Sequence, residues 1–250
     1  MARLPRICAP GHVHLLVQRG NNGQPVFLDD RDRARFVHLL GDAARAAKVA
    51  IHAYALADNQ VFVLATPEQA NSLSNMMQSL GRRYVGEFNR RHGRSGTLWD
   101  GRFRATAIEA ELHLQACISF VELAPLSAAN AADAQAHRWS SARHHLGLVV
   151  DPLVTEHPLY WASGNTPFER EAAHRRRLEL GLEQELQRRI ASAAAKGWAL
   201  GSARFAERLS EASGRRVTPG RRGRPRRPAP ETVPGDDVSP INTVSTPRDV

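Results

Sequence analysis

The spacing of apolar residues changes repeatedly along the first half of the chain, and each spacing predicts a type of element. Short apolar runs bounded by Gly, Asn, Asp or Pro predict strands, whereas apolar residues three and four positions apart predict helices. In chain order these patterns predict a strand, a helix, two strands, a helix and a strand, over residues 12–19, 31–48, 51–56, 61–65, 72–92 and 102–108. This is the order of the ferredoxin-like βαββαβ unit, an α+β fold in which two helices cover one face of a four-stranded sheet.

Beyond this unit, helical periodicity continues and strand patterns stop. Residues 111–123 predict a helix, and segments rich in Ala, Arg, Glu and Leu predict further helices from Pro167 to about Gly214. After Gly214 the apolar periodicity ends in a tail rich in Arg and Pro, a composition typical of disorder. We therefore expect a domain, a helical extension and a disordered basic tail, over residues 1–148, 149–213 and 214–250.

The charge of the chain narrows its partners. The 250 residues have a formal net charge of +9 and a pI near 10.8. Such an excess favours a polyanionic partner, and nucleic acid fits better than a membrane surface. No apolar run is long enough to span a bilayer, and the N-terminus lacks the apolar region of a signal peptide, so we expect a cytoplasmic protein. Cys8 and Cys117 belong to no metal-binding pattern and are expected to be free thiols.

Short motifs in a fixed order run through the predicted domain: Arg19–Asn22, Ala53–Asn59, Met76–Tyr84, Phe88–His92, Gly96–Phe103 and Trp139–Ser141. Together they resemble the REP-associated tyrosine transposases, members of the HUH, IS200-like transposase family of bacterial mobile elements. The resemblance covers roughly residues 3–148, and the segment that follows is similar to an extension carried by one branch of the family. It implies a protein that holds DNA hairpins with single-stranded flanks.

The family's chemistry depends on four positions. Two histidines on a central strand hold Mg or Mn, a tyrosine on a helix attacks a DNA phosphate, and a polar residue four positions later completes the metal shell. The family pattern Asp-Asn-His-x-His-Leu-Leu-Val places Gln60 and Phe62 at the histidine positions. The pattern Arg-Tyr-Ile-x-Leu-Asn-Pro-Val places Phe120 at the nucleophile and Ala124 at the third ligand. A phenyl ring has no oxygen for attack and no lone pair for a cation, so we expect that cleavage is lost and that no metal cofactor binds.

Histidines and a tyrosine also occur outside the family's catalytic positions and could replace the missing groups. His12 and His14 form a His-x-His run, but in the first predicted strand instead of the third, which favours incidental strand histidines over a relocated metal site. Tyr84 is a substitute nucleophile in principle, and its place among apolar helical positions favours a core or DNA-contact role. His144 and His145 have no carboxylate at helical spacing and are expected at the surface.

Arginines concentrate between residues 82 and 104, against only Glu87 and Asp100. We favour a phosphate-tracking surface over a merely solvated basic helix end, because Trp99 and Phe103 are aromatic rings able to stack on unpaired bases. The predicted DNA-binding residues of this surface are Arg82, Arg83, Arg90, Arg91, Arg94, Trp99, Arg102 and Arg104.

The tail carries a separate motif. Its run Arg222-Gly223-Arg224-Pro225 resembles the AT-hook, in which a small Gly permits close approach to the minor groove. This interpretation makes Arg222 and Arg224 contacts to A·T-rich duplex DNA; the alternative is a plain basic tail.

The sequence thus favours a catalytically inactive DNA-binding protein of the transposase family that binds hairpin or single-stranded DNA. One alternative is an active transposase that cuts and joins single strands through displaced residues such as His12, His14 and Tyr84. Another is a host interaction protein without affinity for DNA. Because the family contains both monomers and dimers, the sequence is compatible with a monomer or a homodimer.

Overall fold

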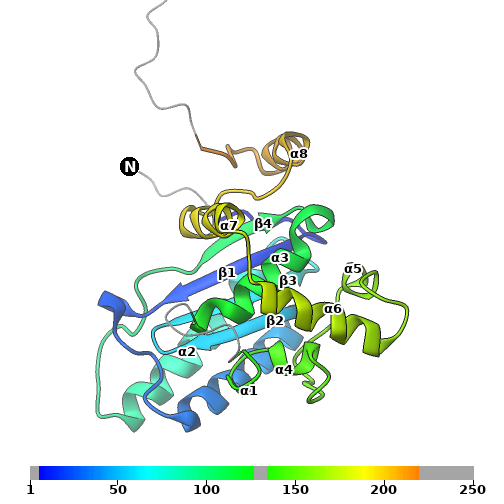
Figure 1. The fold of residues 1–250 in the computed structure, drawn as a ribbon. Helices are drawn as coiled ribbons and strands as arrows, with labels where there is room; N and C mark the ends of the chain where they lie inside the picture. Colours follow the sequence, from blue (N-terminus) through cyan, green and yellow to red (C-terminus); the bar gives the residue numbers. More distant parts are fainter. Residues whose placement is uncertain (1–5, 127–133, 220–250) are drawn as a thin grey trace, which may run out of the picture. The chain divides into compact units, whose positions relative to one another are not determined.

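A computed structural model of the chain describes residues 6–126 and 134–219. Its central sheet has the order β2-β3-β1-β4, built from Val49–Ala57, Gln60–Pro67, Val13–Arg19 and Arg104–Ile108 (Figure 1). All neighbouring strands are antiparallel. One helix joins β1 to β2 and another joins β3 to β4, so the predicted ferredoxin-like α+β fold is confirmed.

Two helices, α1 (Asp30–Ala47) and α2 (Ser72–Arg91), pack against each other on one face of the sheet. The side chain of Asp29 caps α1 by accepting a hydrogen bond from the backbone N–H of Asp32. Lys48 ends the helix in the left-handed conformation, with φ of 54°. The larger hydrophobic core lies between these helices and the sheet.

The opposite face of the sheet is covered as well, by α3 (Ala110–Leu123) and α7 (Gln184–Lys196). The sequence interpretation placed helices on one face only, and the structure corrects it. The signal was present in β1, where Val13 to Val17 are all buried, because a strand covered on both faces is a continuous apolar run. The hydroxyl of Thr106 on β4 donates to the carbonyl of Ala193 on α7, 3.0 Å away.

Several motifs behind the family resemblance have structural roles. A Cβ at Gly20 would lie 2.1 Å from the carbonyl oxygen of Gln24, so only glycine fits there. The backbone N–H of Leu56 donates to the carbonyl of Trp139, and that of Ser141 donates to Tyr54, both at 2.9 Å. The Trp139–Ser141 segment therefore lies alongside β2. These motifs preserve the fold whether or not the chain cuts DNA.

The remaining helices are short or belong to the C-terminal part: η1 (Asn21–Gly23), η2 (Ala124–Leu126), α4 (Ala142–His145), α5 (Pro158–Trp161), α6 (Pro167–Leu180) and α8 (Ala203–Ser213). The boundary near residue 148 stays a prediction. Val217, inside the predicted tail, is buried with Ile7 and Phe205. Residues 220–250, including Arg222 and Arg224, lie outside the described residues. None of the helices in the described ranges is long and apolar enough to cross a membrane.

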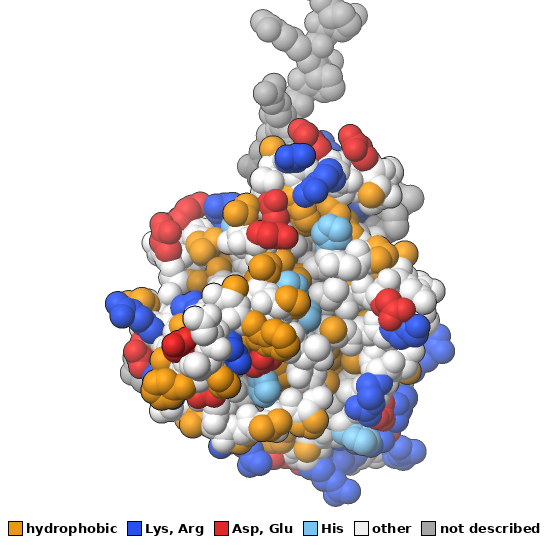
Figure 2. Space-filling model, turned by 90° about the vertical axis from the view of Figure 1, so that its right-hand side faces the viewer, with side chains coloured by type: hydrophobic (Ala, Val, Ile, Leu, Met, Phe, Trp, Pro, Cys, Tyr) orange, Lys and Arg blue, Asp and Glu red, His pale blue; other side chains and the backbone are white. Residues whose placement is uncertain are grey.

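Large apolar side chains reach the surface mainly between α4 and α6. Those with the highest exposure in this segment are Leu148, Val149, Val150, Trp161, Phe168 and Leu180. Figure 2 shows the face that carries α5 and α6, with hydrophobic patches between charged side chains. These exposed apolar residues do not belong to the predicted arginine surface.

Candidate nucleic-acid interface and the catalytic positions

The four positions aligned with the family's catalytic residues come together in one groove. Gln60 and Phe62 lie on β3, Phe120 on α3 and Ala124 at the start of η2, and all four line a cavity of about 640 Å³. The rings of Phe62 and Phe120 meet edge to face, with centroids 6.2 Å apart. Positions far apart in sequence thus meet where a catalytic site would need them, and we call this cavity the catalytic-position groove.

The four aligned positions offer few ligand atoms, and the one carboxylate that lines the groove, Asp58, accepts a hydrogen bond from Arg33 at 2.6 Å. Gln60 provides a neutral amide oxygen, and Ala124 and the two phenyl rings provide no ligand atom at all. A hard divalent ion requires several oxygen or imidazole ligands. Within the described residues, the one group of three ligand-type side chains is formed by Glu122, His145 and His174, none of which lines the groove.

The displaced histidine pair is unsuited to metal binding. His14 is fully buried, its Nδ1 lies 2.8 Å from the carbonyl of His12, and its Nε2 accepts from the N–H of Ala9 at 3.2 Å. Burial lowers its pKa to about 4, so the imidazole is neutral near pH 7. Both ring nitrogens of His14 are engaged with the backbone, which leaves no lone pair for an ion.

Tyr84 is equally unsuited to attack a phosphate. Its side chain is 1% exposed, and its hydroxyl donates to the carbonyl of Val26 at 2.6 Å. Burial raises the pKa of this hydroxyl above its ordinary value. The ring packs against Phe36, Phe88 and Trp99. Tyr84 therefore belongs to the core.

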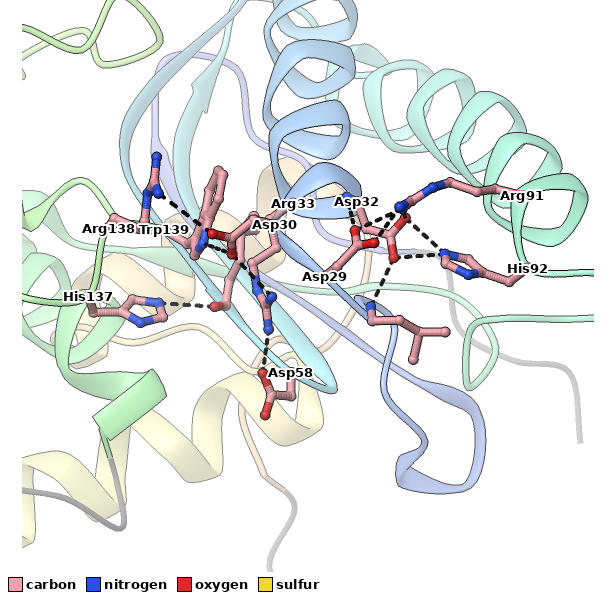
Figure 3. A network of polar contacts seen from close by, with 12 residues as sticks. Asp29, Asp30, Asp32, Arg33, Asp58, Arg91, His92, His137, Arg138 and Trp139 are labelled. Atoms are coloured by element: carbon pink, nitrogen blue, oxygen red, sulfur yellow. Dashed lines mark hydrogen bonds and ion pairs between the residues drawn. The ribbon is translucent and has the colours of Figure 1, made fainter.

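Two of the predicted DNA-binding arginines are committed to ion pairs within the fold. Arg91 donates to both Asp29 and Asp32 at the start of α1, and His92 also contacts Asp32 (Figure 3). Hydrogen bonds from Arg91 lower the pKa of Asp29 below its ordinary range. Arg83 pairs with Asp42 at 3.2 Å. These arginines tie α2 to α1, which weakens their candidacy as phosphate contacts.

The other predicted side chains are better placed. Arg82, Arg90, Arg102 and Arg104 are exposed, and no carboxylate of the described residues forms an ion pair with them. Arg94 lies over the ring of Phe88, with its guanidinium carbon 5.6 Å from the centroid. Trp99 is half-buried. Phe103 is 7% exposed, and the guanidinium carbon of Arg6 lies 3.9 Å from the centroid of its ring. The expectation that Phe103 stacks on a base is therefore wrong.

Basic side chains from distant parts of the chain meet at β4. A cleft of about 250 Å³ is lined by Arg6, Arg102, Arg104, Lys196 and Arg215, without a carboxylate among its lining residues. We call it the cationic cleft. Arg6, Arg102 and Phe103 also line a neighbouring cavity of about 350 Å³, which contains Trp99 and again has no acidic lining. Sequence reasoning missed Arg6, Lys196 and Arg215, because nothing in the local pattern brings the two ends of the fold to β4.

A second cluster was also missed. Glu122 is fully buried and accepts hydrogen bonds from Ser141 Oγ and His145 Nδ1, both at 2.6 Å, and from His174 Nε2 at 2.7 Å. Burial alone would raise the pKa of Glu122, but the two imidazoles outweigh it and hold this pKa below its ordinary value. His145 is 2% exposed, so its predicted surface position is wrong. Its carboxylate partner lies on another helix, where helical spacing could not reveal it.

The topology and the catalytic-position groove define an α+β protein of the ferredoxin-like class. No protein-family model and no curated protein matches the sequence. The chain is similar to a solved REP-associated tyrosine transposase bound to a REP hairpin, at 14% identity over 64% of this chain and 93% of that chain, with a TM-score of 0.49. It is also similar to a candidate transposase of Deinococcus radiodurans R1, at 16% identity over 46% of this chain and 92% of that one, with a TM-score of 0.35.

Proposed function

We propose that this protein binds DNA hairpins or single-stranded DNA and does not cleave them. The observation that carries the proposal is the composition of the catalytic-position groove, where Phe62 and Phe120 pack edge to face. The metal would have to bind beside a phenyl ring, and no hydroxyl is present at the position of attack. Four replaced groups that meet in space make loss of the reaction a simpler account than misalignment.

The cationic cleft supports the DNA-binding part of the proposal. Its three exposed basic side chains, together with exposed Arg82 and Arg90, offer contacts for phosphates of a strand; the three are Arg102, Arg104 and Lys196. Trp99 lines the neighbouring cavity and is partly accessible, which suits stacking on an unpaired base. Phosphates in the cleft and a base beside Trp99 are therefore the arrangement we propose.

Binding of A·T-rich duplex through Arg222 and Arg224 remains a prediction that rests on sequence alone, as does a homodimer. The alternative of an active transposase has lost support, because the candidates His14 and Tyr84 are both buried and hydrogen-bonded to the backbone. Neither of these two side chains, as the structure places them, supports an active transposase.

The proposal is tested with a fluorescent DNA hairpin that carries single-stranded flanks. We expect a complex whose affinity falls as salt rises, detected by fluorescence anisotropy. A matched hairpin without flanks tests whether unpaired bases contribute. Absence of any complex at about 150 mM salt would contradict DNA binding, and cleaved product after incubation with Mn²⁺ would contradict the loss of catalysis.

A further inference from the structure

Three helices converge on one buried carboxylate. Glu122 belongs to α3, His145 to α4 and His174 to α6, and their exposed fractions are 0%, 2% and 0%. One ligand atom of each lies within 4.8 Å of those of the other two. The cluster is separate from the catalytic-position groove, since none of the three residues lines it.

The carboxylate lacks a permanent cationic partner at hydrogen-bond distance. Its three hydrogen-bond donors are Ser141, His145 and His174, and no lysine or arginine of the described residues forms an ion pair with it. A carboxylate withdrawn from water is costly unless a positive charge compensates it. Moreover, Nδ1 of His174 is buried without a partner. The hydrogen bonds alone leave the charge of the carboxylate imperfectly compensated, and Nδ1 of His174 is the atom that carries the ring's proton when Nε2 binds an ion.

We propose that Glu122, His145 and His174 bind one divalent transition-metal ion, of which zinc is the best fit. Two imidazole nitrogens and a carboxylate oxygen form a donor set typical of zinc. Ser141 Oγ, 2.6 Å from the carboxylate, is the nearest candidate for a fourth, neutral oxygen ligand. The ion supplies a fixed positive charge in direct contact with the carboxylate.

The geometry without an ion is that of a hydrogen-bonded cluster, and metal binding changes it in a defined way. Each imidazole–carboxylate contact, at 2.6 and 2.7 Å, holds a proton on the ring nitrogen. Zinc takes the place of these two protons, each of which moves to the other nitrogen of its neutral ring. Tetrahedral ligands about 2.0–2.1 Å from the ion lie about 3.3 Å from one another, so the side chains move by roughly an ångström.

The site is structural in character. All three ligands are enclosed, so no open coordination position faces a substrate. Because His145 and His174 belong to segments that follow the βαββαβ unit, the ion fixes α4 and α6 to α3. This inference is independent of the proposed DNA-binding function.

The test uses the full chain without a polyhistidine tag, stripped with a chelator and titrated with zinc. We expect one zinc per chain by mass spectrometry of the metal and a melting temperature raised by about 5–10 °C when zinc exceeds its Kd about a hundredfold. The variants Glu122→Gln and His174→Asn should lose both effects. His38→Ala removes an exposed histidine and should keep both, which controls for adventitious binding.

Cobalt(II) titration of the unmodified chain tests the same site without any variant, so its result does not depend on whether the variants fold. A four-coordinate cobalt site gives strong visible absorption, which should saturate at one ion per chain and disappear on addition of zinc. Absence of both this spectrum and the zinc-induced shift would overturn the proposal and leave a hydrogen-bonded clamp only. Stoichiometric zinc that persists unchanged in Glu122→Gln and His174→Asn would overturn it as well.

Discussion

The catalytic-position groove and the cationic cleft are both built around the same four-stranded sheet, and their lining residues differ in chemistry. In the groove, Phe62, Phe120 and Ala124 offer neither charge nor ligand, and Phe62 is 9% exposed in a packed cluster. In the cleft, five cations from distant segments line one concave surface. Catalysis depends on a few groups that act as a unit, whereas phosphate binding is spread over many interchangeable charges. A fold can therefore lose the first property and retain the second.

The largest effect is expected from restoring the groove. Gln60→His, Phe62→His, Phe120→Tyr and Ala124→Asn together should convert undetectable cleavage into measurable Mn²⁺-dependent nicking of single-stranded DNA, because ligands and nucleophile return together. Each single reversion should leave nicking undetectable. The triple variant that lacks Phe120→Tyr is the matched control, and it should form no covalent adduct. Nicking from a single reversion would show that the site is not organised as described.

Removing charge from the cleft should weaken binding without affecting the fold. Arg102→Ala with Arg104→Ala should reduce the slope of log K against log salt by about 1.4 on single-stranded DNA, since each lost phosphate contact contributes about 0.7. Arg175→Ala with Arg176→Ala removes the same charge from the exposed side of α6 and is the control. DNA affinity is measured by anisotropy at several salt concentrations. An equal loss of affinity in the two double variants would show that the cleft contributes only through the overall charge of the protein.

Neighbouring arginines on α2 should separate stability from binding. Arg91→Ala removes the contacts to Asp29 and to Asp32, which is 3% exposed, and should lower the melting temperature by a few degrees. Arg90→Ala should leave the melting temperature unchanged and weaken DNA binding slightly. Circular dichroism and anisotropy on both variants check this. The opposite assignment of the two effects would place Arg91 on the DNA-binding surface.

The last prediction concerns His14, the candidate ligand of a relocated metal site. Burial lowers its pKa to about 4, so the unfolded chain takes up a proton below its ordinary pKa of 6.5 while the folded chain does not. The stability from neutral His14 is complete above about pH 6.5 and is lost as the pH falls toward 4, by up to about 3 kcal/mol.

Urea unfolding of the chain and of His14→Asn measures this dependence, and the variant should be less sensitive between pH 6.5 and 4. His38→Ala, which changes an exposed ring on α1, should keep the original dependence. A rise of stability with Mn²⁺ that requires His14 would show instead that the His-x-His pair binds metal.

Much of the fold could be predicted from the sequence. Local periodicity determined the strands and helices of the βαββαβ unit, because each element has an apolar face at its own spacing. The second helical layer escaped prediction because α7 is far from the strands it covers, although the continuous apolar run of β1 already indicated burial on both faces.

The candidate site was only partly predictable. The alignment of motifs located Gln60, Phe62, Phe120 and Ala124, which do meet in one groove. By contrast, the partners of Arg91 are 59 and 62 residues away in sequence, and those of Glu122 include His174, 52 residues away. Long-range charge pairing has no local period, so the sequence could not distinguish a structural arginine from one available to phosphate.

The most direct test is a single reaction of the protein with a labelled, flanked hairpin and Mn²⁺, divided between a native gel and a denaturing gel. The account predicts a retarded band on the native gel and, on the denaturing gel, full-length DNA without a slower protein-linked species. A protein–DNA species that survives boiling in detergent would contradict it, because Phe120 has no oxygen with which to form such a bond.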